Sequence, residues 1–247
     1  MKIALALAVT ALTAASGFPA TNQVTVPGLA DVWLAGQASG TILQGIYALS
    51  DSAPTNSPVL ASSGLNMTAG SYLTFSVTGA TNYDGCQSLT PDGNPCGNFS
   101  TVTAGPYFGI STYAEPIDAL IGVFIGPGTP GGTAPSGLDF SSGGTQAQTT
   151  ISPQMNQVFF IGDGLTGTGS GSVQQFIIPA GATRLYLGSS DGAGANYNNS
   201  GSFSVSVSDS GATAAAAPAA STTVLVVTGL LLVALTGYLF RSRTRTV

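Results

Sequence analysis

The segment from Leu187 to Val207 contains the side chains best suited to bind a ligand. It consists of an apolar run, a loop rich in Gly, Ser and Asn, and a second run in which apolar residues alternate. Asp191 lies at the start of the loop, and Asn198 and Asn199 lie near its end. Carboxylate and amide oxygens on a tightly folding loop are the ligands that Ca²⁺ prefers. The spacing is compatible with a Ca²⁺ site; the alternative is an Asx-rich turn without metal.

The elements that position this loop are predicted to be strands. In Leu73–Val77 and in Phe203–Val207, apolar residues alternate with Ser or Thr, which is typical of half-buried strands. No stretch outside the termini has a helical period. We predict an all-β fold, a jelly-roll-like β-sandwich spanning residues 21–210. The strand candidates are Gln23–Val26, Val32–Leu34, Leu43–Leu49, Tyr72–Val77, Tyr107–Ile110, Ala119–Ile125, Gln157–Ile161, Val173–Ile178, Arg184–Leu187 and Gly201–Val207.

The composition favours an all-β extracellular domain over a helical one. Of 247 residues, 43% are hydrophobic, only 6% are charged and none is His. All ten acidic residues lie between Asp31 and Asp209, where the only base is Arg184. This charge balance argues against binding of nucleic acid, which requires Lys and Arg on its phosphates. Catalysis by a His-activated nucleophile is excluded, and no complete nucleophile motif is present, so we expect no enzymatic activity.

The two ends of the chain predict export and a membrane anchor. Residues 1–20 have one Lys, a short apolar run and small residues, which is the pattern of a secretory signal peptide. Residues 211–221 form an Ala- and Pro-containing linker, and residues 222–240 are apolar for long enough to span a bilayer. The Arg-rich tail, residues 241–247, is expected to stay cytoplasmic, which places the sandwich outside the cell.

The same C-terminal arrangement resembles the bacterial PEP-CTERM type of sorting signal, an apolar helix followed by a short basic tail. That resemblance implies cleavage at the outer face of the membrane. The Pro-Glu-Pro motif is replaced here by Ala216-Ala-Pro-Ala219. A permanent anchor at the cell surface and secretion after C-terminal processing therefore both stay open.

Two long loops interrupt the strand pattern. Thr81–Thr103 contains Cys86 and Cys96, the only cysteines, which we expect to form a disulfide in an oxidising compartment. A zinc site would need four ligands, normally Cys or His, and the chain lacks them. Gly126–Ser152 is rich in Gly, Pro, Ser and Thr, and we predict a flexible insertion without strands.

The loop and several strands resemble the calcium-dependent, galactose-specific bacterial lectins of the PA-I type. The most specific part is Asp191 followed by Asn-Asn-Ser-Gly-Ser-Phe ending at Phe203, with the family's separation between the Asp and the Asn pair. Further segments follow in the family's order, namely Gly70–Tyr83, Thr90–Gly93, Ala119–Gly126 and Ala180–Gly188.

The resemblance implies a Ca²⁺ site completed by a sugar. Carried over by position, Tyr83 and Ala195 bind Ca²⁺ through main-chain carbonyls, and Asp191, Asn198 and Asn199 bind it through side chains. Since Ca²⁺ takes 6–8 oxygens, open positions remain for sugar hydroxyls. Asp191, Gly192 and Asn198 would also contact the sugar.

One half of the family's sugar pocket is missing. The family uses a His and a Gln from the loop after the calcium-binding Tyr, and this chain has no His. The favoured function is a calcium-dependent, lectin-like protein of the cell surface or the secreted fraction, with the sugar left open. The alternative is a noncatalytic surface or matrix protein on the same fold, in which calcium is purely structural or absent.

Overall fold

The computed structural model describes residues 18–45, 50–83, 85–87, 90–93 and 101–211. Their regular structure is almost entirely strand, arranged in several sheets, so the predicted all-β class is confirmed. In these ranges no helix is long and apolar enough to cross a membrane. The predicted signal peptide, linker, membrane helix and Arg-rich tail fall outside the described residues, apart from 18–20 and 211, and stay predictions.

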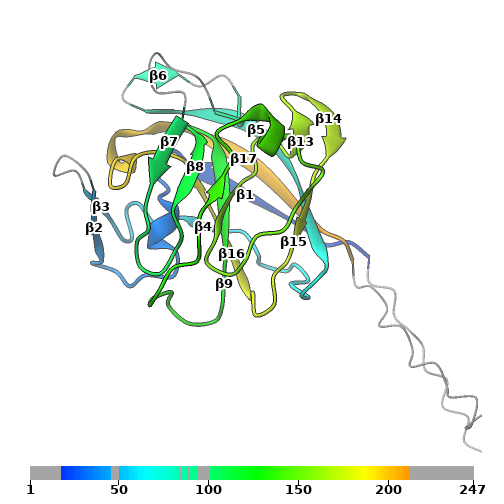
Figure 1. The fold of residues 1–247 in the computed structure, drawn as a ribbon, viewed down its shortest axis with the longest axis horizontal. Coiled ribbons are helices and arrows are strands. Elements are labelled where there is room, and N and C mark those ends of the chain that lie inside the picture. The colour runs from blue at the N-terminus through cyan, green and yellow to red at the C-terminus, as the bar shows by residue number, and fades with distance from the viewer. Residues whose placement is uncertain (1–17, 46–49, 84, 88–89, 94–100, 212–247) are drawn as a thin grey trace, which may run out of the picture. The chain divides into compact units, whose positions relative to one another are not determined.

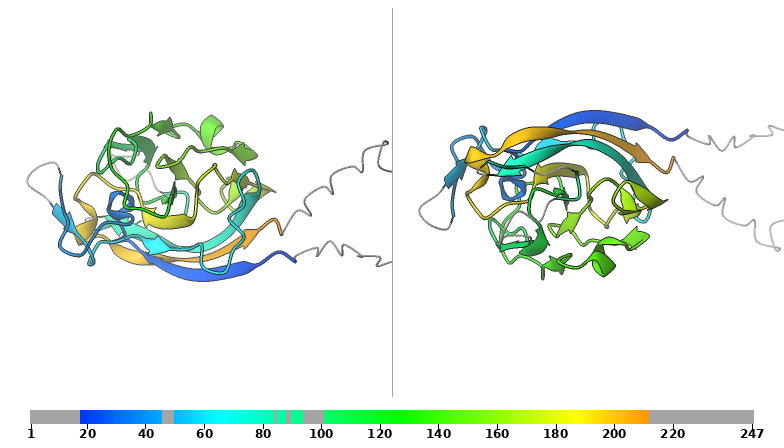
Figure 2. Two further views of the ribbon diagram at one scale, coloured as in Figure 1. Left: turned by 90° about the horizontal axis from the view of Figure 1, so that it is seen from below. Right: turned by 90° about the horizontal axis from the view of Figure 1, so that it is seen from above.

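The larger sheet has six strands and forms one curved layer of the fold, seen edge-on in Figure 2. Its order is β1-β17-β5-β15-β11, and β6 pairs with the end of β5. The predicted alternation on β5 and β17 is confirmed, since their inward-facing residues are buried and the intervening Ser and Thr are more accessible. The strands are β1 (Thr21–Pro27), β5 (Tyr72–Tyr83), β6 (Cys86–Gln87), β11 (Thr150–Ile151), β15 (Gln175–Ile177) and β17 (Ser200–Asp209).

The second sheet packs against the first and is covered on both faces. Its order is β12-β9-β16-β4, with antiparallel pairing throughout. Every residue of β9 is buried, which explains why this strand reads as a continuous apolar run instead of an alternating one. The strands are β4 (Val59–Leu60), β9 (Leu120–Ile125), β12 (Val158–Phe160) and β16 (Arg184–Ser189).

Short elements complete the described part of the fold (Figure 1). A three-stranded sheet has the order β10-β8-β7, and two hairpins pair β2 with β3 and β13 with β14. Their bounds are β2 (Ile42–Gln44), β3 (Ser50–Ser52), β7 (Thr101–Ala104), β8 (Tyr113–Pro116), β10 (Leu138–Asp139), β13 (Leu165–Gly167) and β14 (Ser170–Val173). The helices are η1 (Val32–Leu34), α1 (Gly143–Gln146) and η3 (Asn196–Asn198).

The hydrophobic core has two parts, one on each face of the second sheet. Phe75, Phe176 and Phe203 of the larger sheet pack with Phe124 and Phe159 between the two sheets. On the other face, a second cluster is built around Trp33 and Tyr113, whose rings stack with centroids 4.8 Å apart. Tyr113 of this second cluster also contacts Asp191, the first residue of the loop selected in the sequence analysis.

Three sequence-based expectations were wrong. Val32–Leu34 is the short helix η1, because the Asp31 carboxylate accepts a hydrogen bond from the Trp33 N–H and caps a helical turn. Tyr107–Ile110 is a tight turn in which Phe108 and Gly109 both have positive φ, so its only ladder pair is Tyr107 with Ile110. The segment 126–152 contains β10, α1 and β11, and both strands add to sheet edges in parallel.

Candidate functional site

Strands β5 and β17 bring Tyr83 and Asn199 together. These neighbouring antiparallel strands (Figure 1) pair in a register whose last partners are Ser200 and Asn82. Tyr83 is the last residue of β5, and Asn199 is the residue just before β17, so both lie at the same end of the larger sheet. They are separated by more than one hundred residues in sequence, and the pairing of two long strands brings them to this end.

Asp191 reaches the same end of the fold from the second sheet. The last pair of β16 with β9 joins Ser189 to Leu120, and the Ser190 N–H donates to the Ala119 carbonyl at 3.0 Å. Tyr113 holds the Asp191 backbone through two hydrogen bonds. The Tyr113 hydroxyl donates to the Asp191 carbonyl at 2.6 Å and accepts from the Asp191 N–H at 3.1 Å. The Asp191 residue is only 5% exposed.

Asp118 lies between these two strand ends and was not among the residues selected from the sequence. Its N–H donates to the Ser190 carbonyl at 2.9 Å, and its Oδ2 accepts from the Tyr83 N–H at 3.4 Å. The Thr81 hydroxyl donates to the Asp118 carbonyl at 3.2 Å. Asp118 is fully buried. Its hydrogen bonds connect the end of β5 to Ser190, the residue after β16. The sequence signal available for it is a single Asp directly before a continuous apolar strand.

The environment of Asp118 is unfavourable to a negative charge. Burial raises the pKa of its carboxyl to about 7, the Tyr83 N–H lowers the pKa, and the nearby Asp191 charge raises it. The only base among residues 18–211 is Arg184, whose guanidinium donates to the carbonyls of Gly126 and Gly128. Arg184 and Ser189 are at opposite ends of β16, about 17 Å apart at the rise of a strand.

The loop after Asp191 is held by Asn196, which the sequence analysis also missed. This side chain is 1% exposed, and its Nδ2 donates to the carbonyls of Ser189 at 3.0 Å and Gly28 at 3.2 Å. It begins the short helix η3, which follows Ala195. These two bonds hold the loop against Ser189 and Gly28, which is why an Asn between the predicted ligands is buried.

The predicted ligands of this loop differ in their access to solvent. Asn198 is exposed, whereas Asn199 is 5% exposed. Tyr197, between Asn196 and Asn198, is 46% exposed. The Gly192 N–H donates to the Asp191 Oδ1 at 2.6 Å. The accessible part of the candidate site is therefore the turn at residues 197–198.

Asn199 provides the observation that bears most directly on a cation. Its Nδ2 donates to the Gly28 carbonyl at 3.3 Å, but its Oδ1 is buried and has no hydrogen-bond donor in the described structure. A buried acceptor without a partner costs about 1–3 kcal/mol. Because a neutral amide oxygen is a good ligand for Ca²⁺, the residues present fit this cation. Within the described residues, no three Asp, Glu, His or Cys side chains converge on one point, so a cation here needs amide and carbonyl oxygens in addition to carboxylates.

A second carboxyl pair lies beneath the loop. Asp31 and Asp51 are 1% and 0% exposed, and Asp51 Oδ2 accepts from the Asn196 N–H at 3.0 Å. Asp31 Oδ2 and Asp51 Oδ1 are buried without a hydrogen-bond partner in the described structure. Burial raises the pKa of Asp31 well above its ordinary value, and the Asp51 charge raises it further. The folded protein therefore favours the protonated form of Asp31 more than the unfolded chain does.

We expect Asp31→Asn to reduce the pH dependence of stability. Because the folded pKa is raised, the native state keeps a proton that the unfolded carboxyl loses near pH 4, and wild-type stability falls as pH rises through the folded pKa. The replacing amide still donates to Asp51 and accepts from the Trp33 N–H. The pKa values of Asp118 and Glu115 are also raised by burial, so these two residues still make stability depend on pH in the variant. Between pH 5 and pH 8, urea denaturation should show that the variant loses less stability than the wild type, by about 1 kcal/mol or more. An unchanged loss would contradict the raised pKa of Asp31.

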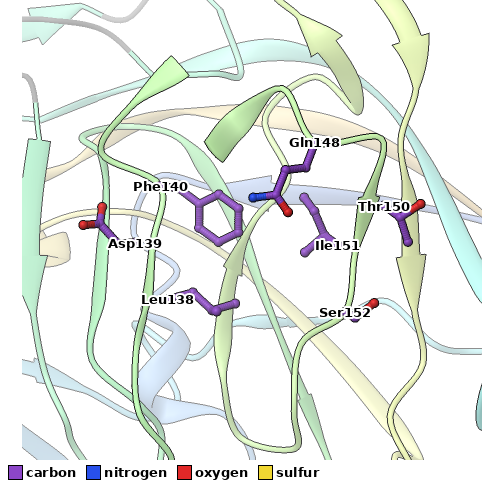
Figure 3. A pocket seen from close by; sticks show the side chains of 7 residues that line it. All are labelled: Leu138, Asp139, Phe140, Gln148, Thr150, Ile151 and Ser152. Carbon is purple, nitrogen blue, oxygen red and sulfur yellow. The ribbon is translucent and has the colours of Figure 1, made fainter. Parts of the chain in front are cut away.

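A pocket of about 320 Å³ lies elsewhere, between β10 and β11 (Figure 3). Phe140 and Ile151 are buried beside it, and the Gln148 side chain points into it. The Asp139 carboxylate at its rim is exposed and accepts from the Ser141 N–H at 2.9 Å. None of the predicted calcium ligands lines this pocket, so Asp139 is a suitable control acid for experiments on the candidate site.

Cys86 lies in β6, whereas Cys96 falls outside the described residues. The Cys86–Cys96 disulfide therefore stays a prediction.

Comparisons with known proteins do not assign the chain to a family. No protein-family model matches it. No curated protein matches it. No solved structure matches its fold. The candidate site is therefore argued from its residues and geometry.

Proposed function

We propose that this chain is an exported, noncatalytic protein that binds Ca²⁺ and, through it, a carbohydrate. The observation that carries the proposal is the position of Asn199. Its amide oxygen is buried without a donor, and it lies just before β17, at the end of the sheet where β5 ends at Tyr83 and where Asp118 contacts Tyr83 and Ser190. The resemblance to the PA-I type of lectin predicts a ligand from each of these segments. The jelly-roll-like arrangement of the sandwich belongs to the same proposal.

The chain's own oxygens account for most of a Ca²⁺ coordination sphere. Tyr83 and Ala195 would contribute main-chain carbonyls, and Asp191, Asn198 and Asn199 would contribute side-chain oxygens. These groups are fewer than the 6–8 oxygens that Ca²⁺ takes, so neutral hydroxyl oxygens of a sugar can complete the set. When bound, Ca²⁺ supplies a positive charge that orients two adjacent hydroxyls.

The sugar is expected at the accessible edge of the site. Of the proposed sugar contacts, Asp191 and Gly192 are buried and Asn198 is exposed. The Asn198 amide can hydrogen-bond a hydroxyl, and the ionised Asp191 accepts a stronger hydrogen bond than a neutral group does. Without the family's His, galactose is not singled out among sugars, and we propose only a carbohydrate with adjacent hydroxyls.

The rival function is a surface or matrix protein in which the cation is purely structural. One observation favours it: Asp191 and Asn199 are each only 5% exposed, so little of the site is open to a second ligand. In that case the cation would join the end of β5 to the loop after β16 and stiffen the domain. The two functions share the metal and differ in whether sugar binds.

Calorimetry on the full-length chain separates these functions. We expect heat on titration with Ca²⁺, and a glycan array probed in Ca²⁺ should give a signal that disappears in EDTA. Ca²⁺ binding without any glycan signal would leave the structural role. Absence of both heat and a rise in melting temperature would rule out both versions of the calcium site.

Export and anchoring belong to the proposal through the two ends of the chain. The predicted signal peptide, residues 1–20, and the predicted membrane helix, residues 222–240, place the sandwich outside the cell. Mass spectrometry of the protein recovered from cells measures both processing events. A mass that retains residues 222–247 supports an anchor, and a mass that lacks them supports C-terminal cleavage.

A further inference from the structure

We propose that Asp118 is a further ligand of the cation and, with Asp191, gives the site its preference for a divalent ion. The inference rests on the proposed calcium site and adds a residue that the resemblance does not include. It assigns a binding function to a buried acid whose contacts described above are structural.

The backbone places Asp118 where such a ligand is needed. Its N–H is bonded to the Ser190 carbonyl at 2.9 Å, one residue before Asp191. Its carboxylate accepts from the Tyr83 N–H at 3.4 Å, and the Thr81 hydroxyl lies 3.4 Å from its Oδ1. Asp118 is thus in contact with both segments from which the resemblance takes ligands, and neither contact comes from a basic group.

The local turn holds the carboxylate in this position. Asp118 has a φ of 62°, a left-handed conformation that Asp and Asn tolerate better than other side chains. The Ala119 N–H donates to the Pro116 carbonyl at 3.3 Å and closes a tight turn just before β9. A turn with no side-chain function would be served better by Gly, which adopts positive φ without strain.

The two negative charges of Asp118 and Asp191 favour the binding of a divalent cation. Asp118 is fully buried and Asp191 is nearly so, and each lies within electrostatic range of the other. Arg184, the only base among residues 18–211, lies at the far end of β16. A divalent cation bound between Asp118 and Asp191 would offset the charges of both. The donorless Oδ1 of Asn199, the residue just before β17 at the same end of the larger sheet, is an independent indication of an electropositive ligand.

We expect Asp118→Asn to change the melting temperature in opposite directions in EDTA and in Ca²⁺. In EDTA the variant lacks one of two buried carboxylates that repel each other, so it should melt higher than the wild type. In saturating Ca²⁺ it lacks a charged ligand, so it should melt lower. Asn also tolerates the left-handed backbone, which keeps the turn intact. A purely structural role for Asp118 would shift both melting temperatures in the same direction.

Binding is measured on the full-length chain by Ca²⁺ calorimetry and by Tb³⁺ luminescence, with Ca²⁺ as competitor. Tyr113 and Trp33 lie near the site and can sensitise the lanthanide. We expect Asp118→Asn to weaken Ca²⁺ binding about tenfold or more, because affinity follows the number of charged ligands. Asp139→Asn, at the distant pocket, is the matched control and should bind as the wild type does.

The outcomes separate this inference from the proposed function. If the wild type binds Ca²⁺ and Asp191→Ala does not, but Asp118→Asn binds normally, the role of Asp118 is refuted and the calcium site survives. If the wild type does not bind Ca²⁺, both fail. Should Asp118→Asn not fold, Asp118→Gly fits the positive φ and removes the carboxylate, and the same comparison applies to it.

Discussion

We expect Asp191→Ala to abolish the stabilisation of this protein by Ca²⁺. Asp191 supplies a charged ligand in the proposed site, and its loop also supplies the Ala195 carbonyl and the Asn198 and Asn199 amides. At a Ca²⁺ concentration one hundred times Kd, binding stabilises the native state by about 2.7 kcal/mol. For a domain of this size, that corresponds to a rise of about 5–10 °C in melting temperature. Differential scanning calorimetry in Ca²⁺ and in EDTA measures the difference.

The control for this prediction is Asp139→Ala. Asp139 is an exposed acid whose carboxylate contacts only its own turn, at Ser141. This variant should keep the full wild-type response to Ca²⁺. The Tyr113 contacts to the Asp191 backbone do not involve its side chain, so Asp191→Ala should retain the fold in EDTA. Equal responses of the two variants would refute the assignment of Asp191.

The largest loss of stability is expected for Trp33→Ala. Trp33 is fully buried, stacks on Tyr113 at 4.8 Å and donates from Nε1 to the Ser111 carbonyl at 3.0 Å. Removal of a buried Trp side chain costs about 3–5 kcal/mol, and the Ser111 carbonyl would lose its donor. Because Tyr113 clamps Asp191, the change should also weaken Ca²⁺ binding. Urea denaturation gives the loss of stability, and calorimetry gives the loss of affinity.

Two further variants test the explanation for Trp33. Trp33→Phe keeps an aromatic ring against Tyr113 and should recover most of the Ca²⁺ affinity. Val173→Ala removes an apolar side chain that is 55% exposed and should change stability by less than about 0.5 kcal/mol. If Trp33→Ala lowered stability without any change in Ca²⁺ affinity, the link from the core through Tyr113 to Asp191 would be wrong.

The strands that carry the site were predictable where one face is buried. On β5 and β17, Leu73, Phe75, Val205 and Val207 alternate with Ser or Thr, and a period of two is a local property of the chain. The same reasoning failed at Val32–Leu34. Three consecutive apolar residues have no period, and the Asp31 cap made them a helical turn. It also failed for β10 and β11, which are short and pair in parallel with strands that lie far from them in sequence.

The sequence alone determined the all-β class and indicated the loop from Asp191 to Asn199, because alternation and Asx-rich turns are written in neighbouring residues. Only the tertiary structure decided which other groups meet that loop. Strand register brings Tyr83 to the end of the sheet at which β17 begins, just after Asn199. Asp118, in the turn before β9, contacts Tyr83, and buried Asp51 accepts from the Asn196 N–H of the loop. Each of these contacts joins residues far apart in the chain. The burial that raises the pKa of a carboxyl group arises only when the sheets pack.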